Sequence, residues 1–160
     1  KMKTPTSILL CIYDFDGVMT NNTVIVNEDG KESVCVNHGD GWAIQQLKTK
    51  GIYQIIVSTE KNKVVGQRAK KLNIDCIQGC DDKKSAVELI SKKHKTPLHQ
   101  ILYVGNDLND YAAMRICGHR AAPQDAETEI KKIATIITAA KGGDGVIREL
   151  YTSLDESWPI

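Results

Sequence analysis

Six apolar stretches rich in β-branched residues alternate with stretches of helical periodicity along this chain. The apolar stretches span 7–13, 52–57, 75–77, 101–104, 119–122 and 133–137, and the helical ones span 41–49, 62–72, 83–94, 109–117, 125–132 and 146–153. Strands that are apolar on both faces and separated by helices form a parallel sheet with helices on each side. The sequence therefore predicts a three-layer, Rossmann-like α/β fold, one domain over residues 1–160, with chemistry at the carboxyl ends of the strands.

Composition excludes several classes of protein. The 21 basic and 20 acidic residues give a net charge of +1, so no overall field favours nucleic acid or an anionic membrane. No apolar stretch approaches the roughly 20 residues of a membrane span, and no signal peptide opens the chain. Five cysteines without a Cys-x-x-Cys pair fit a reduced, cytoplasmic protein better than a zinc or disulfide protein. The Lys1-Met2 start indicates a recombinant end or a domain cut from a longer chain.

The segment Asp14-Phe15-Asp16-Gly17-Val18-Met19-Thr20 directly follows the first apolar stretch. Alternate residues of an extended segment point the same way, so Asp14 and Asp16 should converge while Phe15 turns back. Two carboxylates this close repel unless a cation lies between them or one of them holds a proton. Both states are useful for moving a phosphoryl group, so we interpret this segment as part of an active site.

Polar segments also follow three other predicted strands: Ser58-Thr59-Glu60, Asp82-Lys83-Lys84 and Gly105-Asn106-Asp107-Leu108-Asn109-Asp110. Phosphoryl transfer through a carboxylate needs a nucleophile, a neighbouring acid and Mg²⁺ held by oxygen ligands. It also needs a lysine and a hydroxyl for the non-bridging oxygens. Each segment alone could be a turn or a helix cap. All four together, after alternating strands, predict a phosphoryl-transfer site.

Residues 23–36 interrupt the alternation of strands and helices. Two β-branched runs flank Glu28-Asp29-Gly30-Lys31, which predicts a β-hairpin that projects beyond the sheet. A lone hairpin is marginal in water and needs cover. Its valines and isoleucine therefore indicate a subunit interface.

With these residues, the chain resembles the haloacid dehalogenase (HAD) superfamily of phosphatases over roughly Ile8 to Glu149. It is most similar to the small branch without a large cap that contains 3-deoxy-D-manno-octulosonate 8-phosphate phosphatase. That branch also holds nine-carbon keto-sugar-acid 9-phosphate phosphatases and the C-terminal domains of some sialic acid cytidylyltransferases. Its signs here are the hairpin, Asn37-x-x-Asp40-Gly41, Gln78-Gly79-x-x-Asp82-Lys83 and Gly142-Gly143-x-Gly145-x-x-Arg148-Glu149.

The resemblance implies a role for each catalytic residue. Asp14 would be the nucleophile, and Asp16 would be the general acid and base with its backbone carbonyl on Mg²⁺. Ser58 would bind a phosphate oxygen, Lys83 would bridge phosphate and nucleophile, and Asp110 would support the lysine and the metal shell.

One position departs from the family pattern. A metal-binding carboxylate commonly follows the glycine at Gly105, but Asn106 stands there. Either Asn106 ligates Mg²⁺ through its uncharged amide oxygen, which should weaken Mg²⁺ binding, or Asp107 takes over.

The substrate is less well defined, and the candidate substrate-binding residues are Thr59, Glu60, Lys71, Asp40, Gly17 and Arg148. Glu60 and Lys71 are expected about three turns apart on one helix face, where they resemble members that act on nine-carbon acids. An ordinary charged helix surface is the alternative. The family is usually a tetramer joined by its hairpins, in which a neighbour's C-terminal segment helps close the site. That implies a partner role for residues 142–148.

The favoured hypothesis is a Mg²⁺-dependent phosphatase of a 3-deoxy-2-keto sugar acid phosphate, either a nonulosonate 9-phosphate or an octulosonate 8-phosphate. It would work through an aspartyl-phosphate as a cytoplasmic homotetramer, with no nucleic acid or membrane partner. The alternative is an inactive oligomerisation domain of a sialic acid cytidylyltransferase, which the hairpin and Asn106 would fit. A phospho-receiver domain is disfavoured, because the acid pair follows the first strand together with Gly17 and Thr20.

Overall fold

The computed structural model describes residues 7–159, and a six-stranded parallel sheet lies at its centre. The strand order is β5-β4-β1-β6-β7-β8, so the first strand is central. The strands are β1 (Leu10–Tyr13), β4 (Tyr53–Val57), β5 (Asp75–Ile77), β6 (Ile101–Val104), β7 (His119–Ala122) and β8 (Ile136–Ile137). The predicted α/β fold is confirmed, whereas the chain start at Lys1-Met2 lies outside the described residues.

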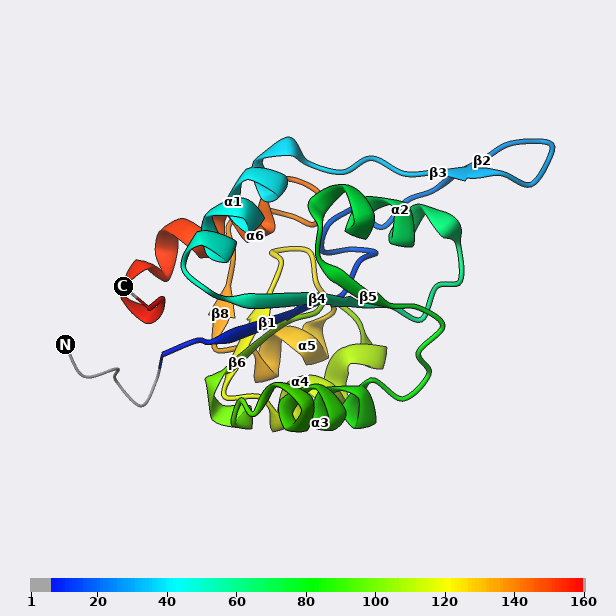
Figure 1. The fold of residues 1–160 in the computed structure, drawn as a ribbon. Coiled ribbons are helices and arrows are strands. Elements are labelled where there is room, and N and C mark those ends of the chain that lie inside the picture. The colour runs from blue at the N-terminus through cyan, green and yellow to red at the C-terminus, as the bar shows by residue number, and fades with distance from the viewer. Residues whose placement is uncertain (1–6, 160) are drawn as a thin grey trace.

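Helices cover both faces of the sheet (Figure 1). On one face lie α1 (His38–Thr49), α2 (Lys63–Leu72) and α6 (Val146–Ser153), and on the other lie α3 (Lys83–His94), α4 (Tyr111–Ile116) and α5 (Thr128–Ile133). Short 3₁₀ turns are η1 (Leu98–Gln100), η2 (Leu108–Asp110) and η3 (Asp155–Ser157). Each face has its own apolar core. Across residues 7–159, every helix is too short or too polar to cross a membrane.

Strand β1 is buried along its whole length, which explains its unbroken apolar sequence. It pairs in parallel with β4 and β6, with Tyr13 opposite both Ile56 and Val104. The ladder continues one residue further, because Asp14 N donates to the Val104 carbonyl at 2.9 Å. The centre of the sheet therefore fixes the backbone of Asp14 directly.

Several predicted boundaries are wrong by a few residues, and helix caps and turns account for most of this. Helix α1 begins at His38 rather than at residue 41, because the Asn37 side chain accepts a hydrogen bond from Gly39 N. The predicted strand at 133–137 shrinks to Ile136–Ile137, since Ile133 still belongs to α5. The predicted helix at 109–117 starts as the 3₁₀ turn η2, which a reciprocal capping box between Asp107 and Asp110 stabilises.

The hairpin is present, with β2 (Ile25–Val26) pairing antiparallel to β3 (Glu32–Ser33). It extends well beyond the body of the molecule (Figure 1). Gly30 closes the turn with a φ of +80°, and Val24, Ile25 and Val26 are 48%, 61% and 62% exposed. Two residue pairs cannot hold such a hairpin in water alone. Its role as a subunit interface stays a prediction.

That prediction can be tested with Ile25→Lys. A buried charge in an interface is costly, so we expect the variant to shift towards monomer in light scattering coupled to size-exclusion chromatography. Leu89→Lys on α3 is the matched control, because Leu89 is 67% exposed and equally apolar. An unchanged mass for Ile25→Lys would remove the hairpin from the interface.

Candidate active site

The loop after β1 holds Asp14 in a fixed position at the edge of the sheet. Asp14 is 5% exposed, and its Oδ1 accepts a hydrogen bond from Phe15 N at 2.8 Å. Gly17 has a φ of +83°, and its N donates to the Thr20 Oγ1 at 3.2 Å. A β-carbon at Gly17 would lie 1.9 Å from the Asn106 amide nitrogen, so only glycine lets Asn106 approach this loop.

Lys83 lies between two buried carboxylates. Its Nζ is 2.9 Å from Asp14 Oδ1 and 2.8 Å from Asp110 Oδ1, and the lysine side chain is 1% exposed. Burial alone would lower the pKa of Lys83, but the two carboxylates outweigh it and raise the pKa, so the side chain remains an ammonium. The first residue of α3 thus brings a positive charge to the carboxyl end of β1.

Asp110 organises the loop after β6. Its Oδ2 accepts the backbone N–H groups of Asn106 at 3.0 Å and Asp107 at 3.3 Å. Its Oδ1 accepts Lys83 Nζ and also the Tyr103 hydroxyl, the latter at 2.7 Å. Sequence reasoning missed Tyr103. The available signal was a hydroxyl in a strand that is otherwise apolar on both faces.

The side-chain amide of Asn106 contacts the loop after β1. One of its two terminal atoms lies 2.9 Å from both Asp14 Oδ2 and the Asp16 carbonyl oxygen. With nitrogen there, the amide donates two hydrogen bonds, and with oxygen there, three oxygens face one another. Cis ligands of an octahedral Mg²⁺ with bonds of 2.0–2.1 Å are about 3 Å apart, so this oxygen triangle suits a divalent cation.

Asp107 does not belong to the oxygen triangle. Its Oδ1 accepts a hydrogen bond from the backbone N–H of Leu108 and caps η2. Asp107 does line the cavity that opens beside the triangle. Of the two candidate ligands, Asn106 is therefore the one that lies in the oxygen triangle, and its role as a metal ligand stays a prediction.

The charge state of Asp14 also fits a cation. Burial raises its pKa well above the ordinary range, the neighbouring Asp110 raises it further, and Lys83 offsets this only in part. A nucleophilic carboxylate must be ionised. A divalent cation at the oxygen triangle would supply the missing positive charge.

A cavity of about 320 Å³ opens above these residues. Ser58 lines it and is 1% exposed, with its Oγ accepting Glu60 N at 3.1 Å. Asp16 also lines it and is partly buried. Its pKa is raised by burial first, and then by the charges of Glu60 and Glu32. An acid with a raised pKa beside a nucleophile is suited to giving a proton to a leaving group.

The cavity includes some predicted substrate residues and omits others. Thr59 and Glu60 line it, whereas Gly17 does not and lies next to Asn106, which does. The placement of Glu60 on the helix is wrong, because Glu60 lies in the loop before α2, which begins at Lys63. Lys71 lies at the far end of α2 and lines a separate groove beside the hairpin.

Asp40 and Arg148 lie away from the cavity. Asp40 is 2% exposed, and its Oδ1 accepts the N–H groups of Ile147 at 3.0 Å and Arg148 at 3.1 Å. It therefore caps α6, whose own cap residue, Gly145, has no side chain to do so. The Arg148 guanidinium stacks on Trp42 at 3.7 Å from the ring centre.

The glycine-rich segment before α6 packs against the loop after β1 of the same chain. Gly143 N donates to the Val18 carbonyl at 3.1 Å, and a β-carbon at Gly142 would lie 2.1 Å from the Gly17 carbonyl oxygen. The spacing of these glycines therefore reflects close backbone packing. A contribution of residues 142–148 to a neighbour's site stays a prediction.

A model of the haloacid dehalogenase-like hydrolases matches residues 67–150. The 3-deoxy-D-manno-octulosonate 8-phosphate phosphatase of Yersinia pestis is 34% identical over 146 residues, or 90% of this chain and 78% of that protein. The chain belongs to the haloacid dehalogenase-like hydrolases. The predicted family is thereby confirmed.

Solved structures give the same result. The 3-deoxy-D-manno-octulosonate 8-phosphate phosphatase of Moraxella catarrhalis, in complex with magnesium, phosphate and KDO, superposes with a TM-score of 0.91 at 31% identity. The match covers 96% of this chain and 88% of that one. A HAD family hydrolase from Streptomyces avermitilis has a TM-score of 0.89 at 37% identity, with 97% and 92% covered.

Asn106→Asp should strengthen Mg²⁺ binding roughly tenfold, because it adds a charged ligand to the oxygen triangle. Isothermal titration with MgCl₂ measures this without any substrate. Asn109→Asp is the matched control, since Asn109 lines the cavity but lies outside the triangle. Equal gains in the two variants would show that cavity charge, rather than ligation at Asn106, sets the affinity.

Asp40→Asn should change how stability depends on pH. Burial is the main cause that raises the pKa of Asp40 from 3.8 to about 6, so the folded state holds a proton that the unfolded state releases first. Wild-type stability from this group is present below pH 4 and is lost as pH rises through 6. The variant lacks this loss, and its unfolding free energy relative to wild type should rise by up to about 3 kcal/mol between pH 4 and 7.

Urea unfolding at several pH values checks this difference, with exposed Asp155→Asn as the control. A gap between Asp40→Asn and wild type that stays constant with pH would contradict the prediction.

Proposed function

We propose that this chain is a Mg²⁺-dependent phosphatase that hydrolyses a 3-deoxy-2-keto sugar acid phosphate through an aspartyl-phosphate on Asp14. One observation carries the proposal. The buried Asp14 carboxylate contacts the Lys83 ammonium at 2.9 Å through its Oδ1, while its Oδ2 belongs to an oxygen triangle suited to a divalent cation. Membership of the hydrolase family and the octulosonate 8-phosphate phosphatases among its relatives support it.

The residues present can carry both halves of the reaction. A carboxylate oxygen of Asp14 attacks phosphorus, the bond from phosphorus to the sugar oxygen breaks, and Asp16 gives its proton to that oxygen. Asp16 then takes a proton from water, which attacks phosphorus and releases phosphate and free Asp14. Lys83 and the Ser58 hydroxyl face the non-bridging oxygens. Asp14, the Asp16 carbonyl and Asn106 would hold Mg²⁺, which would supply positive charge to offset the negative charge of the carboxylate and the phosphate.

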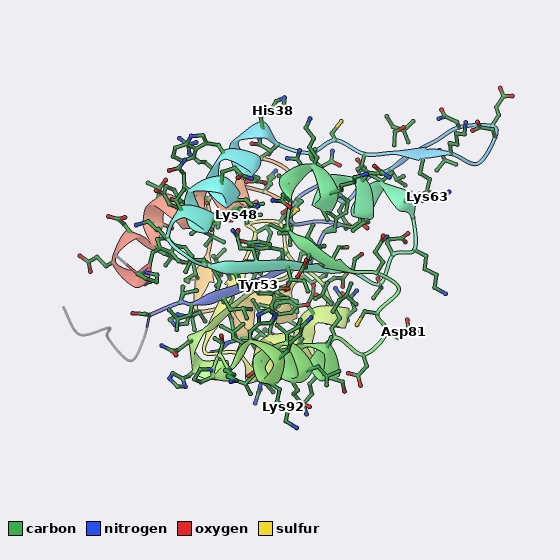
Figure 2. All side chains as sticks on the ribbon, viewed as in Figure 1. His38, Lys48, Tyr53, Lys63, Asp81 and Lys92 are labelled. Atoms are coloured by element: carbon green, nitrogen blue, oxygen red, sulfur yellow. The ribbon has the colours of Figure 1, made fainter. Side chains whose placement is uncertain are left out.

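The distribution of charge beside the cavity supports an acidic sugar as substrate. Among the described residues, the side chains that line the cavity include acids but no base. A groove that shares the wall at Glu32, Val34, Asn62 and Val64 is rich in bases. Lys63 marks it next to the hairpin (Figure 2), and the bases are Lys31, Lys61, Lys63, Arg68 and Lys71. The acids of the cavity repel a phosphate unless a divalent cation at the oxygen triangle and the Lys83 ammonium offset them, so the phosphate would lie against these two cations. The carboxylate of the same substrate would lie over the basic groove, where the charge is complementary.

The length of the sugar acid is the finer part of the proposal. Glu60 lines the cavity and Lys71 lines the basic groove, and their resemblance to residues of members that act on nine-carbon acids favours a nine-carbon acid 9-phosphate. The names of the relatives instead favour the eight-carbon 8-phosphate. A homotetramer joined by the hairpins in the cytoplasm completes the proposal.

A second candidate rests on Asn106 and on the exposed hairpin. An uncharged amide in place of a carboxylate weakens a Mg²⁺ site, and an apolar hairpin serves assembly whether or not the site is active. The chain would then be an oligomerisation domain of a sugar-activating protein.

Phosphate release from both sugar acid phosphates separates these candidates. We expect turnover of at least one substrate at millimolar Mg²⁺, its loss with EDTA, and a fall of more than about 10³-fold in kcat for Asp14→Asn, because the nucleophile is gone. Exposed Asp81→Asn should keep wild-type activity. Intact oligomers without turnover would favour the assembly role, and full activity of Asp14→Asn would refute the aspartyl-phosphate route.

A further inference from the structure

Tyr103 is a fully buried residue of β6, and its hydroxyl contacts the buried Asp110. It donates to Asp110 Oδ1 at 2.7 Å, and the same oxygen accepts Lys83 Nζ at 2.8 Å. Asp110 itself is 0% exposed. The hydroxyl therefore shares one carboxylate oxygen with the ammonium that contacts Asp14.

The hydrogen bonds of Asp110 are fully used. Its Oδ2 accepts two backbone N–H groups, and its Oδ1 accepts Lys83 and Tyr103, which occupies about all four lone-pair sites of a carboxylate. Tyr103 supplies the one neutral side-chain donor among them. Loss of this donor would leave Lys83 as the sole partner of Oδ1, because no water can easily replace the hydroxyl in a fully buried site.

We propose that Tyr103 is a positioning residue for the phosphatase reaction, acting through Asp110 to hold the Lys83 ammonium against Asp14. The tyrosine hydroxyl satisfies part of Asp110 Oδ1, so Asp110 does not draw the ammonium away from the nucleophile. This role rests on the proposed function, since it matters only if Asp14 receives a phosphoryl group. A residue within the core strand β6 would thus help to hold positive charge at the atoms where negative charge develops during the reaction.

The sheet gives Tyr103 the rigidity that this role needs. Tyr103 pairs with Ile12 in the register of β1 and β6, two residues before Asp14 along the neighbouring strand. Its ring belongs to the apolar core that also contains buried residues of α3 and α4. Tyr103→Phe therefore keeps the ring and removes only the oxygen.

The chain offers a matched control in Tyr13. Tyr13 is also in a central strand, is 1% exposed, and donates its hydroxyl to Gln54 Oε1 at 2.7 Å. It packs in the core on the opposite face of the sheet from Tyr103. Tyr13→Phe thus loses the same group from a similar environment without touching Asp110.

The experiment measures kcat, KM and thermal stability for Tyr103→Phe and Tyr13→Phe, using the substrate that wild type turns over. Tyr103→Phe should lower kcat about tenfold with KM changed less than about twofold, as expected when one hydrogen bond to a charged group is lost. Tyr13→Phe should keep wild-type kcat, even if both variants lose similar stability. In an Asp110→Asn background, Tyr103→Phe should cause no further loss of kcat.

Three results would overturn the proposal. One is an active wild type with the kcat of Tyr103→Phe within twofold of it, which makes the hydroxyl purely structural. Another is an equal fall in kcat for Tyr13→Phe, which makes the effect a general one of core polarity. The third is an undiminished effect in the Asp110→Asn background, which removes Asp110 as the route. A wild-type protein that releases phosphate from neither sugar acid phosphate would instead refute the proposed function, and the role of Tyr103 would fall with it.

Discussion

The buried ammonium of Lys83 is the interaction on which the rest of the site depends. Two buried carboxylates, Asp14 and Asp110, come from the segments that follow the neighbouring strands β1 and β6. Without a cation between them, their repulsion and desolvation would force at least one to take up a proton. Helix α3 begins at Lys83 and delivers that charge from a third part of the chain. The parallel sheet matters because it brings all three to one edge.

The neutralisation is incomplete, and this defines the chemistry. Lys83 balances one negative charge, while it contacts the carboxylates of both Asp14 and Asp110, and the half-buried Asp16 adds a third carboxyl group to the loop after β1. Burial is the main cause that raises the pKa of both Asp14 and Asp16, and neighbouring carboxylates raise it further: Asp110 at Asp14, Glu60 and Glu32 at Asp16. One of these acids needs to be ionised to attack, and the other needs a proton to donate. The Asp14 carboxylate and the backbone carbonyl of Asp16 would hold a divalent cation together with Asn106, and the charge of that cation would then favour the ionised form of Asp14 more than that of the Asp16 side chain.

Much of this could be predicted from local sequence, because strand ends in a parallel sheet are a strong geometric constraint. Apolar runs located the six strands, and the polar residues that follow them located Asp14, Ser58, Lys83 and the Asn106 loop. What sequence could not give is any contact set by tertiary packing. Asp40 stands in a family motif beside Gly41, yet it is used to cap a helix about a hundred residues away. Glu60 precedes its helix by three residues, because Asn62 provides the cap. The hydroxyl of Tyr103 is invisible in a pattern that records only apolar and polar positions.

The small size of the fold would link its chemistry to its assembly if the hairpin is the proposed subunit interface. No separate domain covers the cavity in the described part of the chain, so its wall on one side is the hairpin, through Val24, Glu32 and Val34. That hairpin has two residue pairs and an exposed apolar edge, which is too little to hold a fixed shape in water. A wall that is rigid enough to select a substrate therefore needs a surface to pack against. If the hairpin is the proposed subunit interface, the neighbouring subunit also fixes one side of the cavity, and subunit association and substrate selection would depend on the same few residues.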